Sequence, residues 1–285
     1  MHSPAPAEHA PAKINLALHV TGRRADGYHL LESLAVFTEF GDRLVVNPAA
    51  EDSFSVTGPF APQVPRDAGN LVIRARDTLR ALSPAAAAPV AISLEKNLPV
   101  ASGIGGGSSD AAAALRALAR HWGIEADLAA LGLSLGADVP MCLAARPLVA
   151  RGIGEHLEAL AGLPPLPLVL VNPGIGISTP DVFRALASRE NSPLPPLPGR
   201  LDLASVLQWL RATRNDLENP AKTLAPAIGD ALDALGSAGS PFARMSGSGA
   251  TCFGLFETDA AAAHAAEAIR AGHPGWFVAA TTSMR

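Results

Sequence analysis

The chain has 285 residues, of which 48% are hydrophobic and 17% charged, and a formal net charge of −4. This length allows one large or two smaller domains with a substantial core, and the acidic balance disfavours a general nucleic-acid-binding protein. No apolar run reaches the roughly 18 residues of a membrane span, and the first residues lack the basic and apolar regions of a signal peptide. Cys142 and Cys252 lie in apolar contexts, so we expect buried free thiols, no zinc site and a reducing cytoplasmic location.

The first part of the chain mixes strand and helix signals. Period-two alternation predicts a half-buried strand over 12–20, with Lys13 and Asn15 on its polar face, and Asp26-Gly27 marks a hairpin turn. In chain order we then expect strands over 30–40, 43–47, 54–57 and 90–94, helices over 70–82, 109–122 and 125–135, and a hairpin over 147–160 around Gly152.

A Pro-rich stretch over 161–167 predicts a boundary between a domain over 1–162 and a domain over 163–285. After it we expect strands over 168–172, 242–245, 251–257 and 276–283, helices over 179–189, 202–212, 217–235 and 259–271, and a surface loop over 191–200. This order of strands and helices is typical of an α+β sandwich.

The most informative stretch is residues 98–110, LPVASGIGGGSSD, which an alanine-rich helical run follows at once. Glycines let the backbone turn its N–H groups inward, and a helix N-terminus favours negative charge. The stretch therefore predicts a phosphate cradle, with a flexible linker ending in a Ser/Asp N-cap as the alternative. It is neither of two common phosphate loops, because the chain has no Gly-Lys pair and Ser108 replaces the third glycine of the dinucleotide fingerprint.

Four further features could take part in catalysis or binding, and each could instead have a purely structural role. Lys13 is a cation that could stabilise a transferring phosphoryl group, or part of a solvated strand face. Asp138 could accept a proton from an alcohol, or could bond nearby backbone in a turn that Pro140 ends. Tyr28 and His29 could stack on a base, or form an exposed turn. Residues 246–250, SGSGA, could be a second phosphate-proximal nest, or a tight connection between strands.

Three motifs in this order resemble those of the GHMP kinase superfamily: 11–16 (PAKINL), 99–112 around GIGGGSSDAA, and 245–256 (MSGSGATCFGLF). Within the superfamily, residues 24–29, 105–109 and 135–140 are similar to the branch that phosphorylates a cytidine diphosphate-linked methylerythritol. The resemblance spans about residues 11 to 257. It implies an α+β fold of two domains, the N-terminal one similar to ribosomal protein S5 domain 2 and the C-terminal one ferredoxin-like.

The resemblance also implies an activity: ATP-dependent phosphorylation of the 2-hydroxyl of that substrate, in non-mevalonate isoprenoid precursor biosynthesis, with Mg²⁺. It implies a monomer or homodimer that binds neither nucleic acid nor membrane. Lys13 and Asp138 match the catalytic pair. The family's binding residues match three sets here: for the ATP phosphates Pro99, Val100, Ala101, Ser102, Gly103, Ile104, Gly105, Gly106, Gly107, Ser108 and Ser109, with Ser108 near Mg²⁺; for the adenine side Asn70, Leu71 and Lys96; and for the cytidine end Asn15, Tyr28, His29 and Phe183. Ala35 departs from the pattern, since some relatives carry a bulky aromatic there.

Three alternatives remain open on the sequence. Another GHMP enzyme, acting on homoserine, mevalonate or a sugar, is disfavoured by the Asp-Gly-Tyr-His turn at 26–29. A nucleotide-binding regulator without catalysis is disfavoured by the presence of both Lys13 and Asp138. An RNA-binding module, suggested by the S5-like domain, is disfavoured by the acidic charge.

Overall fold

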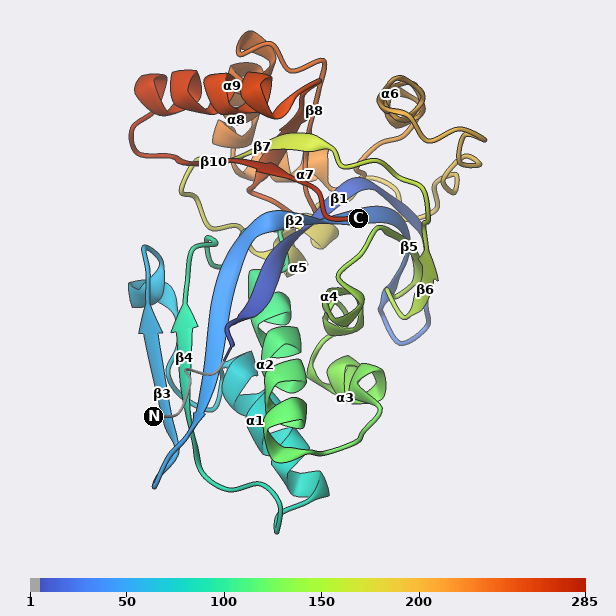
Figure 1. Cartoon of the computed structure of the whole chain (residues 1–285). Coiled ribbons are helices and arrows are strands. Elements are labelled where there is room, and N and C mark those ends of the chain that lie inside the picture. Colours follow the sequence, from blue (N-terminus) through green and yellow to red (C-terminus); the bar gives the residue numbers. More distant parts are fainter. Residues whose placement is uncertain (1–5) are drawn as a thin grey trace. The chain divides into compact units, whose positions relative to one another are not determined.

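The computed structural model describes residues 6–285, which divide into two compact units (Figure 1). The first unit holds the described residues up to Ala12, 41–100 and 105–144, and the second holds 13–40, 101–104 and 145–285. The boundary falls within strands β1 (Glu8–Arg23) and β2 (His29–Pro48), each of which contributes residues to both units. The units divide the chain at other places than residue 162, so the boundary at the Pro-rich stretch stays a prediction. Residues 1–5 of that predicted first domain lie outside the described part.

In the first unit, a small sheet is covered by helices. The second part of β2 pairs antiparallel with β4 (Val90–Glu95), and β4 pairs parallel with β3 (Ser53–Thr57). The helical segments are η1 (Ala61–Gln63), α1 (Leu71–Leu82), α2 (Gly106–Trp122), α3 (Leu128–Leu135) and α4 (Val139–Ala144). Helices α1 and α2 lie side by side (Figure 1). Residues 111–114 of α2 are alanines that are wholly buried, and small side chains of this kind let α2 approach its neighbours closely.

In the second unit, the first part of β2 pairs with β5 (Leu148–Gly152), which pairs with β6 (His156–Ala159). A separate antiparallel sheet has the order β10-β7-β9-β8. Its strands and the helices between them are β7 (Pro167–Asn172), α5 (Thr179–Arg184), α6 (Leu203–Arg211), α7 (Glu218–Leu224), α8 (Ala227–Ser237), β8 (Phe242–Met245), β9 (Cys252–Leu255), α9 (Asp259–Gly272) and β10 (Phe277–Thr282). Numbered within this sheet the order is 4-1-3-2, which confirms the predicted ferredoxin-like fold of the C-terminal half.

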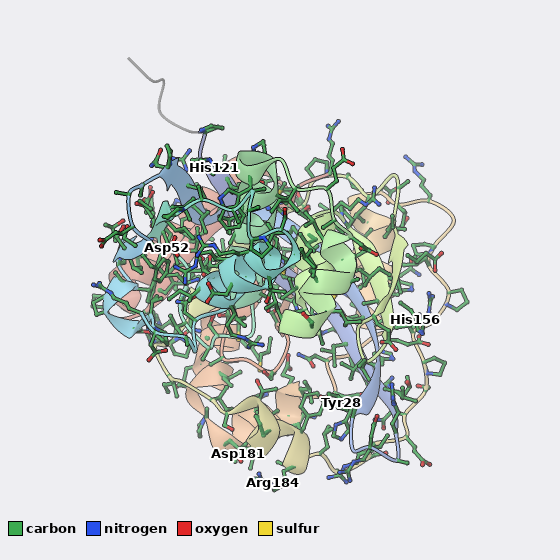
Figure 2. The ribbon with its side chains drawn as sticks, turned by 90° about the horizontal axis from the view of Figure 1, so that it is seen from below. Tyr28, Asp52, His121, His156, Asp181 and Arg184 are labelled. Atoms are coloured by element: carbon green, nitrogen blue, oxygen red, sulfur yellow. The ribbon has the colours of Figure 1, made fainter. Side chains whose placement is uncertain are left out.

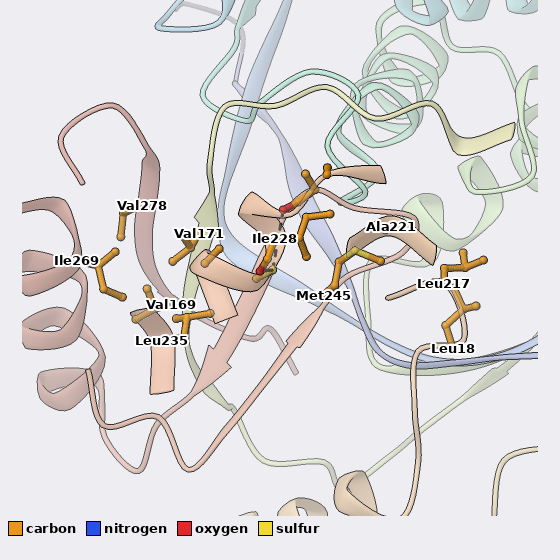
Figure 3. Packing of buried hydrophobic residues seen from close by; sticks show 14 of the residues in the cluster. Leu18, Val169, Val171, Leu217, Ala221, Ile228, Leu235, Met245, Ile269 and Val278 are labelled. Atoms are coloured by element: carbon orange, nitrogen blue, oxygen red, sulfur yellow. Dashed lines mark hydrogen bonds between the residues drawn. The ribbon is translucent and has the colours of Figure 1, made fainter. Parts of the chain in front are cut away.

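The core of the second unit lies between this sheet and helices α8 and α9 (Figure 3). Val169 and Val171 of β7 are two residues apart and so point to the same face of the sheet. They share one buried cluster with Ile228 of α8 and Ile269 of α9. The apolar face of each helix therefore packs against the face of the sheet that carries Val169 and Val171.

The structure corrects four predicted elements. The strands expected over 30–40 and 43–47 are one strand, β2, because Gly41 continues the strand instead of breaking it. A Cβ at Gly41 would lie 2.4 Å from the carbonyl oxygen of Ala10, so glycine allows two backbones to approach closely. The helix expected over 217–235 is divided into α7 and α8 at Pro226, and the helix expected over 179–189 ends at Arg184.

The predicted burial of the first strand is also wrong. β1 is buried on both faces rather than half-buried: Lys13, Asn15 and His19 are each 5% exposed or less. Among residues 6–285, no helix is long and apolar enough to cross a membrane.

Candidate active site

The glycine loop joins β4 to α2 through a run of left-handed backbone. Ala101, Gly103 and Gly105 have φ values of 50°, 77° and 66°. Helix α2 begins at Gly106, earlier than the predicted residue 109, and its cap is the backbone of Gly105 without any side-chain hydrogen bond. The Ser/Asp N-cap of the linker alternative is therefore wrong.

The first turn of α2 is built to admit a ligand. Gly106, Gly107 and Ser108 form this turn, so they carry N–H groups that have no acceptor within the helix. A Cβ at Gly107 would meet only Leu71 Cδ1, at 3.9 Å. Left-handed glycines before an open helix N-terminus are the arrangement that binds phosphate groups, so the residues fit the nucleotide that the sequence predicts.

A buried cluster of charges lies behind this turn, within the first unit. Lys96 Nζ donates to Asp42 Oδ2 and to Asp110 Oδ2, both at 2.6 Å. The side chains of Lys96, Asp42 and Asp110 are 3%, 0% and 5% exposed. Asp42 Oδ1 also accepts hydrogen bonds from the backbone N–H groups of Asn97 and Leu98.

Burial and charge oppose each other in this cluster. Burial lowers the pKa of Lys96, but the carboxylates of Asp110 and Asp42 outweigh it, and the pKa lies above its ordinary value. Burial raises the pKa of Asp110 to about 8; the Lys96 ammonium opposes this rise, and the neighbouring Asp42 adds to it. The Lys96 ammonium therefore stays charged, and both of its hydrogen bonds go to carboxyl groups. The predicted contact of Lys96 with adenine stays a prediction, and its charged end is already engaged.

The second glycine loop packs on the first within the second unit. Gly103 is close enough to residues 246–249 that a Cβ there would lie 2.5 Å from the Ser246 carbonyl oxygen. Ser246 Oγ donates to the carbonyl oxygen of Gly103 at 3.1 Å, and the Thr251 N–H donates to the carbonyl oxygen of Ser102 at 3.0 Å. Residues 246–250 thus connect β8 to β9 and support the conformation of 101–104, while their role as a second phosphate-proximal nest stays a prediction.

Two predicted residues of β1 adjoin these loops. The Lys13 N–H donates to the carbonyl oxygen of Ile104 at 2.9 Å, and the Asn15 N–H donates to Ser246 Oγ at 3.0 Å. Asn15 Nδ2 donates to Ser33 Oγ at 2.7 Å, whereas Asn15 Oδ1 is buried without a hydrogen-bond partner among the described residues. The amide is therefore held in one orientation with an acceptor to spare.

The second unit also holds an aromatic pair that includes two of the residues predicted for the cytidine end. The rings of His29 and Phe183 stack with centroids 4.6 Å apart and planes 25° apart. Burial, and then the positive charges of Arg23 and Arg189, lower the pKa of His29, and its Nε2 has no partner among the described residues. Tyr28, labelled in Figure 2, is 60% exposed at the turn.

Helix α5 connects the aromatic pair with the second glycine loop. It carries Phe183 near its end, while Thr179 Oγ1 at its start lies 2.7 Å from Ser248 Oγ. Helix α5 thus contacts His29 through Phe183 at its end and Ser248 of the second glycine loop through Thr179 at its start.

Asp138 directly precedes α4, a helix that the sequence did not predict. Pro140 is the second residue of this helix, where proline is well tolerated, so it starts the helix rather than ending one. The Cys142 N–H donates to the carbonyl oxygen of Asp138 at 3.1 Å. Asp138 belongs to the first unit and Lys13 to the second, so their predicted pairing stays a prediction.

Sequence reasoning missed the residues that support the site. Asp110 belongs to the stretch predicted as a phosphate cradle, or to the N-cap of the linker alternative, and Asp42 lies between the strands expected over 30–40 and 43–47. Nothing local predicts their burial, because Asp42 stands beside Arg43 and Asp110 follows Ser108 and Ser109. Ser246 was found as part of a loop, but nothing local predicts its hydrogen bond to Asn15, which is 231 residues away in the chain.

The two halves of the chain match models of one kinase superfamily. The model of the GHMP kinases N terminal domain matches residues 70–146, and the model of the GHMP kinases C terminal matches residues 200–275. A crystal structure of the mevalonate kinase of L. major in complex with R-mevalonate aligns with a TM-score of 0.64 at 15% identity, over 100% of this chain and 99% of that one. This likeness shows a shared fold. Together with the glycine loop, these matches define the chain as a GHMP kinase.

Two relatives with higher sequence identity show which of the GHMP kinases this chain resembles in sequence and fold. The chain is 64% identical to the 4-diphosphocytidyl-2-C-methyl-D-erythritol kinase of Mesorhizobium japonicum over 280 residues, 97% of this chain and 95% of that protein. A crystal structure of 4-(cytidine 5'-diphospho)-2C-methyl-D-erythritol kinase aligns with a TM-score of 0.81 at 38% identity, over 98% of this chain and 100% of that one. The chain belongs to the 4-diphosphocytidyl-2-C-methyl-D-erythritol kinase family. Its match to a kinase family disfavours the alternatives of a regulator without catalysis and of an RNA-binding module.

Proposed function

We propose that the chain transfers the terminal phosphoryl group of ATP to the 2-hydroxyl of 4-diphosphocytidyl-2-C-methyl-D-erythritol, a step of non-mevalonate isoprenoid precursor biosynthesis. The observation that carries the proposal is the open glycine turn at the start of α2, in a chain 64% identical to a kinase of that name. Both substrates are small molecules.

The glycine loop supports binding of the ATP phosphates. The N–H groups of the first turn of α2 and the helix dipole favour a negative group there. Phosphoryl transfer needs little covalent help from a protein, so positioning and electrostatic stabilisation would supply most of the rate. Asn70 and Leu71, at the start of α1, are proposed to contact the adenine side; Asn70 is already engaged as the N-cap of that helix.

The aromatic pair supports recognition of the cytidine. The lowered pKa keeps His29 neutral near pH 7, and a neutral imidazole offers one donor and one acceptor to the edge of a pyrimidine. Phe183 and the exposed Tyr28 offer ring faces on which the base can stack. Asn15 Oδ1, a buried acceptor without a partner, suits a hydroxyl or amine donor of the substrate.

The catalytic step follows from the predicted roles of two residues. The 2-hydroxyl oxygen attacks the γ-phosphorus, the bond to the β–γ bridging oxygen breaks, and ADP leaves. Asp138 accepts the hydroxyl proton, and Lys13 stabilises the carboxylate and the charge on the moving phosphoryl group. Mg²⁺, when bound, would neutralise charge on the phosphate oxygens, with Ser108 as its proposed protein ligand. Among residues 6–285, no group of three or more His, Cys, Asp or Glu side chains could hold a metal ion.

A coupled assay of ADP release tests the proposal directly. Purified protein is given ATP and Mg²⁺ with either the cytidine-linked substrate or methylerythritol 4-phosphate, which lacks the cytidine. Turnover that requires the cytidine is expected. Equal turnover of both acceptors would overturn the substrate assignment, and absence of turnover with either would overturn the kinase assignment. We further propose a cytoplasmic location, to which the free, buried Cys142 and Cys252 are suited, and a monomer or homodimer.

A further inference from the structure

We propose that Lys96 is a positioning residue, which joins the two ends of the glycine loop through Asp42 and Asp110 and so holds the loop ready for ATP. This inference rests on the proposed ATP-dependent function and assigns the Lys96 side chain to the loop rather than to the nucleotide. We call Asp42, Lys96 and Asp110 the loop staple.

The contacts of the staple fix both ends of the loop. At the beginning, the Asn97 and Leu98 N–H groups donate to Asp42 Oδ1, at 2.5 and 2.8 Å. At the end, Asp110 lies in the second turn of α2 and accepts from Lys96 Nζ at 2.6 Å. The hydrogen bond from Lys96 Nζ to Asp110 thus closes the loop of residues 97–109. The hydrogen bond from Lys96 Nζ to Asp42 ties the same ammonium to the carboxyl group that holds the beginning of the loop.

The backbone of Lys96 is fixed as firmly as its side chain. Its N–H donates to the carbonyl oxygen of Thr57 at 2.8 Å, and its carbonyl oxygen accepts from the Phe60 N–H at 3.2 Å. Gly58 packs against this backbone, since a Cβ there would lie 2.6 Å from the Lys96 carbonyl oxygen. Lys96 is therefore a rigid point of attachment on the sheet for the start of α2.

The staple also reaches the phosphate-binding turn itself. A Cβ at Gly106 would lie 3.1 Å from Lys96 Nζ. Gly106 has ordinary helical backbone, not a positive φ, so the space beside the ammonium is the structural reason for glycine at this position. The turn predicted to cradle the phosphates thus rests directly on the staple.

Stability alone is a poor explanation for these charges. Two buried carboxyl groups share one ammonium, burial raises the pKa of Asp110 against its ionised form, and Asp110 Oδ1 has no hydrogen-bond partner among the described residues. Buried ion pairs are often no more stabilising than apolar side chains of similar volume, and an unpaired polar atom is destabilising. A fixed geometry is what such a cluster supplies and an apolar cluster does not.

Asp110 is the member to replace, because its removal leaves Lys96 and Asp42 as a neutral pair. Asp110→Ala continues the alanine run of α2, so we expect the protein to fold. Asp110→Asn keeps the shape and one oxygen acceptor for Lys96. Glu8→Gln is the matched control, because Glu8 is bound to Arg116 and Arg120 of α2, away from the glycine loop.

Calorimetry with ATP on the full chain measures the consequence. Asp110→Ala should raise the Kd for ATP about 5- to 30-fold, the cost of reordering roughly one residue of the loop on binding. KM for ATP should rise with it, while KM for the cytidine substrate stays constant. Asp110→Asn should stay within about 3-fold of the wild type, and Glu8→Gln should not change ATP affinity even where its Tm falls.

The possible results of these measurements test the proposed role of the loop staple and the proposed function separately. Unchanged or tighter ATP binding by folded Asp110→Ala overturns the staple, because the charges would then serve stability alone. If Asp110→Ala does not fold, hydrogen exchange of residues 97–109 in ATP-free Asp110→Asn and wild type decides: faster exchange confined to the loop supports the staple, and identical exchange overturns it. A wild-type protein that binds ATP but phosphorylates no cytidine-linked substrate contradicts the proposed function and leaves the ATP comparison valid.

Discussion

Tyr28→Ala is the cleanest test of cytidine recognition, because the structure separates its effect on binding from its effect on stability. The side chain is 60% exposed, and the turn is held by backbone groups that alanine keeps: the Arg24 N–H donates to the Tyr28 carbonyl oxygen, and the Tyr28 N–H donates to Asp26 Oδ1. A surface substitution of this kind changes the free energy of unfolding by less than about 0.5 kcal/mol. Loss of one base–aromatic stack removes about 1–3 kcal/mol.

The expected result is therefore a change in one kinetic parameter. We expect kcat/KM for the cytidine-linked substrate to fall about 5- to 150-fold, from 1–3 kcal/mol at 1.36 kcal/mol per decade. Steady-state assays that vary each substrate in turn measure this, with Tm as the check on folding. Tyr28→Phe, which keeps the ring, should lose much less.

Two results of the same assays would contradict cytidine recognition by Tyr28. An equal loss for ATP and for the cytidine substrate would show that the turn does not recognise the base specifically. A fall in Tm that accounts for the lost activity would show that Tyr28 is structural, in spite of its exposure.

Four further predictions follow from single residues. Asp138→Asn should lower kcat about 10²–10⁴-fold with little change in the Kd for ATP, and wild-type turnover would remove its role as the base. Gly106→Val should weaken ATP binding measured by calorimetry, because its side chain meets Lys96 Nζ; unchanged affinity would contradict this. Arg244→Met should lower the free energy of unfolding by about 2 kcal/mol or more in denaturant titrations, since its buried guanidinium donates four hydrogen bonds. His19 has a pKa lowered by burial, so its contribution to stability is present above about pH 6.5 and is lost as the pH falls; the fall in Tm from pH 8 to 5 should be smaller in His19→Gln.

Local patterns predicted the elements whose signals are local. Asn70 was expected at the start of a helix, and it caps α1 by accepting a hydrogen bond from the Val72 N–H. The order of strands and helices in the C-terminal half was also predictable from apolar periodicity, with glycine-containing connections at several of the boundaries. The family resemblance supplied the topology, which periodicity alone does not determine.

The predicted element boundaries are wrong where an interaction between residues distant in the sequence overrides a local rule. Gly41 reads as a break between strands, but it lies where the backbone of Ala10 needs the space of a side chain. Pro140 reads as a stop, although proline is equally suited to the first turn of a helix. Neither case could be decided without knowing which segment packs against the residue.

The polar face of β1 shows how partners distinguish a structural residue from a functional one. The alternation of Asn15 and His19 with apolar residues predicts a solvated face, yet the structure buries both side chains. His19 is fully satisfied: the Arg214 N–H donates to Nε2, which leaves Nδ1–H to donate to the Ser192 carbonyl oxygen. Asn15 is held by Ser33 but keeps Oδ1 without a partner among the described residues. Burial of an unsatisfied acceptor is unfavourable in the protein alone, so a ligand with a matching donor gains most at Asn15 and nothing at His19.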